Sequence, residues 1–83
     1  PNPFNPTTSI NFDIPNNTNV TIAVYDINGR LVANLFNGFK SAGYHTISWD
    51  SRNQLGGKVS AGVYFYQLQS KEFVKTRKMI LLK

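Results

Sequence analysis

The sequence contains no cysteine, which excludes a disulfide framework and any metal site built on thiolates. It has one histidine and four acidic residues, so the groups that acid–base catalysis and metal binding require are scarce. No apolar run approaches the ~18 residues that a membrane-spanning helix needs. We therefore expect no enzyme, no cofactor, no metal and no insertion into a membrane.

The length of 83 residues corresponds to one small domain. A chain of this size buries about 60–65% of the surface that its unfolded form exposes, so a deep catalytic cleft is difficult to form in it. The sequence begins at Pro1 without a charged and apolar leader. We expect an excised or processed module of a longer polypeptide that ends at Lys83.

The net charge of +5 is concentrated at the C-terminal end. Residues 71–83 carry five of the nine basic side chains and one of the four acidic ones. A basic end favours local electrostatic recognition, whereas nucleic-acid binding would require basic and exposed aromatic residues interleaved on one face. Lysines on an edge strand also prevent edge-to-edge pairing, and the two roles are compatible.

Apolar and polar residues alternate with a period of two, and no segment keeps a helical period of 3.6 residues. Asn, Gly and Pro separate the alternating segments, and we expect the polar segments 37–43 and 51–58 to be loops. Six or seven short strands in this pattern predict an all-β fold, a small antiparallel immunoglobulin-like β-sandwich. The expected strands cover residues 10–14, 20–24, 31–36, 44–49, 63–69 and 73–82.

The dipeptide Asn28-Gly29 is a hairpin signal, because both residue types tolerate the positive φ of a type I′ turn. A hairpin that closes on Ile27 and Arg30 would place Val24 opposite Ala33 and Ile22 opposite Leu35. The same stretch resembles the start of a calcium loop, but the later carboxylate ligands are missing. The hairpin is the better interpretation.

The segment from Ser60 to Tyr66 is typical of a tyrosine corner, in which the Tyr64 hydroxyl bonds back to upstream backbone. Gly62 would permit the tight backbone turn into the strand, and Tyr66 would point inward. The expected core comprises Ile10, Phe12, Val20, Ile22, Val24, Leu31, Leu35, Ile47, Trp49, Tyr64, Tyr66 and Leu68.

His45 shares a strand face with Ile47 and Trp49, which predicts a partly buried or rim position rather than a catalytic or metal-binding one. The aromatic side chains raise the alternative of a carbohydrate-binding module, which requires Trp49 and Tyr44 to be exposed in a planar row. A minimal sandwich without disulfides also needs large rings for its core, so we expect Trp49 to be buried.

The tail KTRKMILLK at residues 75–83 contains four consecutive apolar residues, which cannot all face one core. If Met79 and Leu81 pack inward, Ile80 and Leu82 must face water, a covering loop or a partner. Two exposed aliphatic side chains beside cations would form a patch suited to recognition. This candidate patch contains Lys75, Arg77, Lys78, Ile80, Leu82 and Lys83.

The chain resembles the type A C-terminal sorting domain of the type IX secretion system. The matching stretches are PNPFNP at 1–6, VYDINGRLV at 24–32, GYHTISWD at 43–50, GVYFY at 62–66 and TRKM at 76–79. The middle motifs are also similar to the immunoglobulin-like domain of the flagellar hook-cap protein. That relative is a scaffold, so the likeness of fold does not by itself fix the function.

The resemblance implies a non-catalytic sorting signal carried by an exported cargo. Residues 1–6 would be a Pro-rich junction to an upstream cargo domain of the same chain, and residues 7–83 the sorting domain. The outer-membrane secretion machinery would recognise Gly62, Val63, Tyr64 and the tail, and the protein would pass through the periplasm to the cell surface or the medium. The alternative is a structural, self-associating immunoglobulin-like module of an extracellular protein or filament.

Overall fold

The computed structural model describes residues 7–82. The expected junction at residues 1–6 and the terminal Lys83 lie outside these residues. The described chain folds into β1 (Thr8–Ile14), β2 (Thr18–Tyr25), β3 (Leu31–Lys40), β4 (Gly43–Trp49), β5 (Gly62–Gln69) and β6 (Val74–Leu81). Every pairing between these strands is antiparallel, which confirms the expected immunoglobulin-like β-sandwich.

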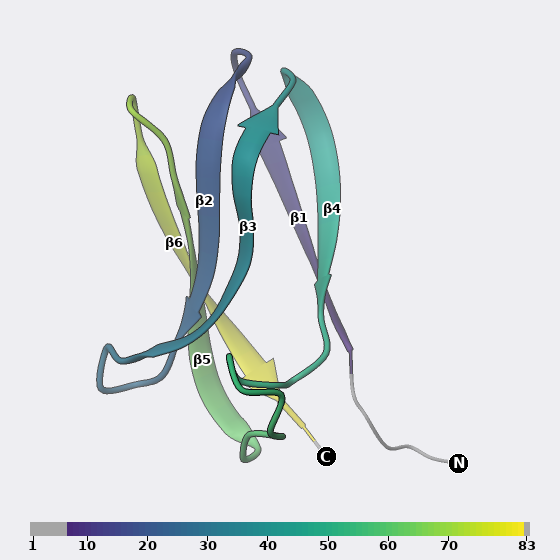
Figure 1. The fold of residues 1–83 in the computed structure, drawn as a ribbon, viewed down its shortest axis with the longest axis vertical. Coiled ribbons are helices and arrows are strands. Elements are labelled where there is room, and N and C mark those ends of the chain that lie inside the picture. The colour runs from purple at the N-terminus through teal and green to yellow at the C-terminus, as the bar shows by residue number, and fades with distance from the viewer. Residues whose placement is uncertain (1–6, 83) are drawn as a thin grey trace.

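The strands form two sheets of unequal width (Figure 1). One sheet contains β1 and β4, and the other has the order β3-β2-β5-β6. Because β1 pairs with β4 alone and β6 with β5 alone, each of β1 and β6 keeps one edge that no described strand covers. The narrow sheet is therefore too small to cover the whole inner face of the wide one.

The core between the sheets is built from alternating side chains of both sheets. Most of the expected members are buried, but Leu35, Ile47 and Tyr66 are only partly buried at its margin. Leu31 is 47% exposed, so its prediction as a core residue is wrong. The core cluster contains Ile10, Phe12, Ile14, Val20, Ile22, Val24, Trp49, Tyr64, Leu68, Met79 and Leu81.

The β2–β3 hairpin is not the expected type I′ turn. Gly29 has a φ of +80°, but Asn28 does not have a positive φ. The Gly29 N–H donates to the Asp26 carbonyl at 3.0 Å, and the Asp26 N–H donates to the Arg30 carbonyl at 2.9 Å. These bonds define a three-residue loop, in which a type I turn is followed by a left-handed glycine.

The longer loop and two bulges change the register of β3. Val24 lies opposite Ala33 as expected, but Ile22 lies opposite Phe36 rather than Leu35. The irregularities fall between Ile22 and Ala23 and between Val24 and Tyr25. A bulge inserts one extra residue into a strand, so side chains beyond it change faces relative to a regular ladder. This explains why Leu31 leaves the core.

Strand β3 continues through Asn37 and Gly38, where the sequence pattern predicts a loop. Gly38 pairs with Val20, and a Cβ on Gly38 would lie 3.3 Å from the Phe36 ring, closer than side chains usually pack. The Lys40 ammonium then lies 4.3 Å from the centre of the same ring. Gly38 thus does not end the strand. Its lack of a side chain leaves room for the Phe36 ring.

Candidate functional site

The last strand, β6, presents different side chains on its two faces. Met79 and Leu81 are buried in the core, whereas Ile80 and Leu82 keep 61% and 75% of their surface exposed. Strand geometry alternates the side chains, so the four consecutive apolar residues divide equally between the core and the outer surface. No described segment covers Ile80 or Leu82.

The outer face of β6 joins that of β5. In the register of this pair, Val63 lies opposite Ile80 and Phe65 lies opposite Lys78. Side chains directly opposite each other in an antiparallel pair share a face and contact each other. We call Val63, Phe65, Lys78, Ile80 and Leu82 the outer patch, an aliphatic and aromatic surface beside a cation.

The structure divides the cations of the candidate patch between the two faces of β6. Lys75 and Arg77 lie opposite Leu68 and Tyr66 of β5, on the inward face of β6. Lys78 lies on the outward face with Ile80. The candidate patch therefore consists of two surfaces, one on each face of β6.

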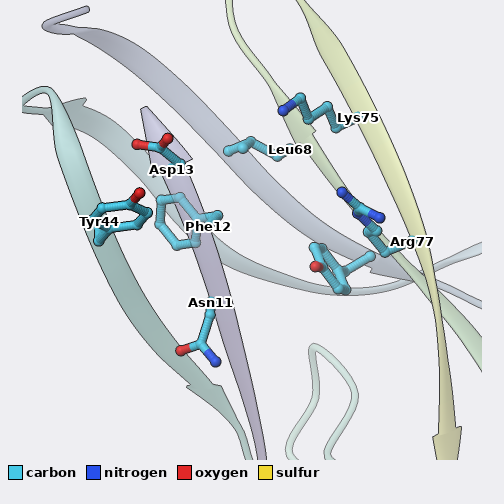
Figure 2. A pocket seen from close by; sticks show the side chains of 8 residues that line it. Asn11, Phe12, Asp13, Tyr44, Leu68, Lys75 and Arg77 are labelled. Atoms are coloured by element: carbon cyan, nitrogen blue, oxygen red, sulfur yellow. The ribbon is translucent and has the colours of Figure 1, made fainter. Parts of the chain in front are cut away.

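Lys75 and Arg77 line a groove of about 280 Å³ between the two sheets. Figure 2 shows these two side chains on one side of the groove and Phe12, Asp13 and Tyr44 on the other. The sequence pattern does not predict this groove, because its walls come from strands distant in sequence. The one feature of the sequence that points to it is the pair of cations at Lys75 and Arg77, which are in phase with the buried Met79.

Tyr64 forms the corner bond that joins β5 to the preceding loop. Its hydroxyl donates to the Ser60 carbonyl at 2.7 Å, and its ring packs edge-to-face on Trp49 at 5.3 Å between centres. Burial raises the pKa of Tyr64, so the hydroxyl remains a neutral donor at ordinary pH. Gly62, with a φ of +147°, starts the strand in a conformation that favours glycine. Tyr64 thus holds β5 in place against the core, and β5 in turn carries β6.

Replacing Tyr64 with phenylalanine should lower the free energy of unfolding by about 0.5–1.5 kcal/mol, because the ring contact stays and the corner bond is lost. Urea unfolding followed by the fluorescence of the single Trp49 would measure this. Tyr66→Phe is the matched control, since Tyr66 is a partly buried tyrosine of the same strand and its hydroxyl has no hydrogen bond within residues 7–82. Equal unfolding midpoints for the two variants would contradict a stabilising corner bond.

The titratable groups that raised metal or catalytic alternatives have structural roles. His45 stacks on Phe12 with ring centres 5.5 Å apart, and its Nε2 lies 2.7 Å from the Ser41 carbonyl. Asp26 accepts the N–H groups of Arg30 and Asn28 on Oδ1, and the bond from Arg30 is the main cause that lowers the pKa of this carboxyl. His45 is half-buried, as expected for a rim position.

Among residues 7–82, no group of three or more histidine, cysteine or carboxylate side chains is placed to hold a metal ion. Within the same range, no helix is long and apolar enough to cross a membrane.

The aromatic residues do not form the row that carbohydrate binding requires. Trp49 is 1% exposed, while Tyr44 on the same strand is 88% exposed. The Trp49 indole donates to the Arg52 carbonyl at 2.9 Å inside the fold. The expected burial of Trp49 is therefore confirmed, and the exposed planar platform that the carbohydrate-binding alternative requires at these two positions is absent.

The two antiparallel sheets of the described chain define a small immunoglobulin-like domain. The family model of the FlgD Ig-like domain matches residues 2–72, and the chain belongs to this family. The match ends before β6 begins at Val74. No curated protein sequence matches the chain.

Among solved structures, FlgD from P. aeruginosa is similar, with a TM-score of 0.73 and 25% sequence identity. The alignment covers 92% of this chain and 60% of that chain. The chain thus spans less than two thirds of that relative.

Proposed function

We propose that the domain is a non-catalytic structural module that docks onto a partner protein through the outer patch of β5 and β6. The observation that carries this proposal is the exposure of Ile80 and Leu82 on a strand whose intervening residue, Leu81, is in the core. Membership of the FlgD Ig-like family supports a structural rather than a catalytic role. A second copy of the chain or another extracellular protein would serve as the partner.

The size of the patch fits a reversible contact. Burying Ile80 and Leu82 would contribute about 3–5 kcal/mol before the costs of association are subtracted. Lys78 on the same face would add orientation and association rate more than affinity. A contact of this strength holds a module in place when it is repeated or when the parent protein supplies further contacts.

Site-specific photo-crosslinking tests the docking surface. A photoreactive residue at position 82 of the parent protein should give one discrete adduct, which Ile80→Ser abolishes because it removes half of the exposed aliphatic surface. The same residue at position 55 is the control, since Leu55 is also a highly exposed leucine but lies in a loop far along the chain. Identical adducts from both positions would contradict docking through the outer patch.

A second candidate function is sorting through the type IX secretion system. The observation that favours it is the same exposed tail, which coincides with the recognition elements of the sorting domains that the sequence resembles. Residues 7–83 would then be the sorting domain, residues 1–6 its junction to the cargo, and the outer-membrane machinery the partner of the outer patch. The protein would pass through the periplasm to the cell surface or the medium.

The double variant Ile80→Ser/Leu82→Ser, fused behind a reporter in a type IX-secreting host, tests sorting. Deleting the tail would be less informative, because it also removes the core residues Met79 and Leu81. We expect the reporter to accumulate in the periplasm while the domain stays folded, since exposed substitutions change stability by about 0.5 kcal/mol or less. Leu55→Ser is the control. Normal surface delivery of the double variant would rule out this function.

A further inference from the structure

The groove between the sheets has an apolar floor and a charged rim. Its floor contains Phe12 and Leu68, which belong to the core, and the partly buried Tyr66. The rim contains Lys75 and Arg77 from β6 and Asp13 from β1 (Figure 2). A concave apolar surface with a few polar groups at its edge is the usual form of a binding site.

The rim carries more positive than negative charge, and none of its charges is neutralised within the described chain. The ion pairs among residues 7–82 join Arg30 to Asp26 and Arg52 to Asp50, and both lie outside the groove. Lys75 and Arg77 therefore have no carboxylate within ion-pair distance among these residues. Two free cations against one carboxylate favour an anionic occupant.

The backbone around the groove favours an extended occupant. The groove is lined by β1 on one side and β6 on the other, and each of these strands has one edge that no described strand pairs with. An unpaired edge presents backbone N–H and C=O groups that an added strand can bond. A strand added to β6 would send alternate side chains toward Lys75, Arg77 and the groove.

We propose that the groove binds an extended acidic segment of another polypeptide, which adds to the edge of β6. Its carboxylates, on alternate residues of the added strand, lie against Lys75 and Arg77, and the aliphatic stems that carry them lie over Phe12 and Leu68 in the groove. A second copy of the chain adding through its own β6 is disfavoured, because this strand brings basic side chains against basic side chains at a formal charge of +5 per chain. Its charged contacts are on the inward face of β6, whereas the side chains of the outer patch are on the opposite face.

The experiment is a titration of the isotope-labelled chain with a synthetic peptide of about nine residues in which glutamate alternates with valine, a length within the range of single strands. Amide resonances of β6 and of residues around Phe12 and Leu68 should shift. The double variant Lys75→Glu/Arg77→Glu should weaken binding about tenfold or more, which corresponds to ~1.4 kcal/mol. Both residues are exposed, so the variant should fold.

The matched control is Lys58→Glu/Lys71→Glu, which makes the same change of charge at exposed positions outside the groove and outside β6. It should bind the peptide within about threefold of the original chain, as screened charges away from the site contribute little. Equal weakening by both double variants would overturn the proposal, as would equal binding of a peptide with lysine in place of glutamate. The same shifts with free glutamate alone would show an anion site rather than a strand site. A chain dimer in sedimentation that Lys75→Glu/Arg77→Glu dissociates would make a second copy the occupant and also overturn it.

Discussion

Replacing Trp49 with alanine is expected to lower the free energy of unfolding by about 3–5 kcal/mol, the largest effect of any single substitution considered for this chain. The side chain is 1% exposed and belongs to the core between the sheets. The substitution removes its edge-to-face contact with Tyr64 and leaves the Arg52 carbonyl without the indole donor. A domain of this size has little stability in reserve, so much of the population should unfold at growth temperature.

Circular dichroism during heating would measure the effect, because the variant lacks the single tryptophan. The midpoint should fall by at least about 12 °C, since each kcal/mol corresponds to about 4–8 °C in a domain of this length. Tyr44→Ala is the control, as it removes an aromatic ring from an exposed position on the same strand. A similar small shift for both variants would show that Trp49 is not a principal support of the core.

The alternation of apolar and polar residues was sufficient to predict the strands and the fold, because each strand buries one face. It was not sufficient for β3. There the register depends on a three-residue loop after Asp26 and on two bulges, which arise from pairing with β2 rather than from the β3 sequence alone. Leu31 was misplaced for this reason. Asn37-Gly38 predicts a loop, but both residues continue β3 because they pair with Thr21 and Val20 of β2, a pairing between segments distant in sequence.

The candidate site was predictable only within a single strand. The period of two placed Ile80 and Lys78 on the face opposite Met79, and the structure has this arrangement. The period could not show that Lys75 and Arg77 face a groove. The opposite wall contains Phe12 and Asp13, and it is brought there by long-range pairing and by the unequal widths of the two sheets.

Strand β6 is therefore the element on which both proposals depend. Its C-terminal half and the residue that follows it supply two core residues and two exposed aliphatic ones, and its N-terminal half supplies the cations of the groove. A substitution at Ile80 or Leu82 changes only the outer patch, and one at Lys75 or Arg77 changes only the groove. The two functions can be tested separately because the alternation of the strand keeps them on opposite faces.

Adjacent leucines at the end of β6 should give opposite results when each is replaced with alanine. Leu81→Ala removes a side chain that is 3% exposed and should lower the free energy of unfolding by about 2–5 kcal/mol. Leu82→Ala alters an exposed side chain and should change it by about 0.5 kcal/mol or less, while weakening any contact made by the outer patch. Urea unfolding followed by Trp49 fluorescence would compare the two with the same chemical change in each. Large losses in both variants would mean that Leu82 is enclosed by the fold, and small losses in both would mean that the end of β6 is not packed against the core.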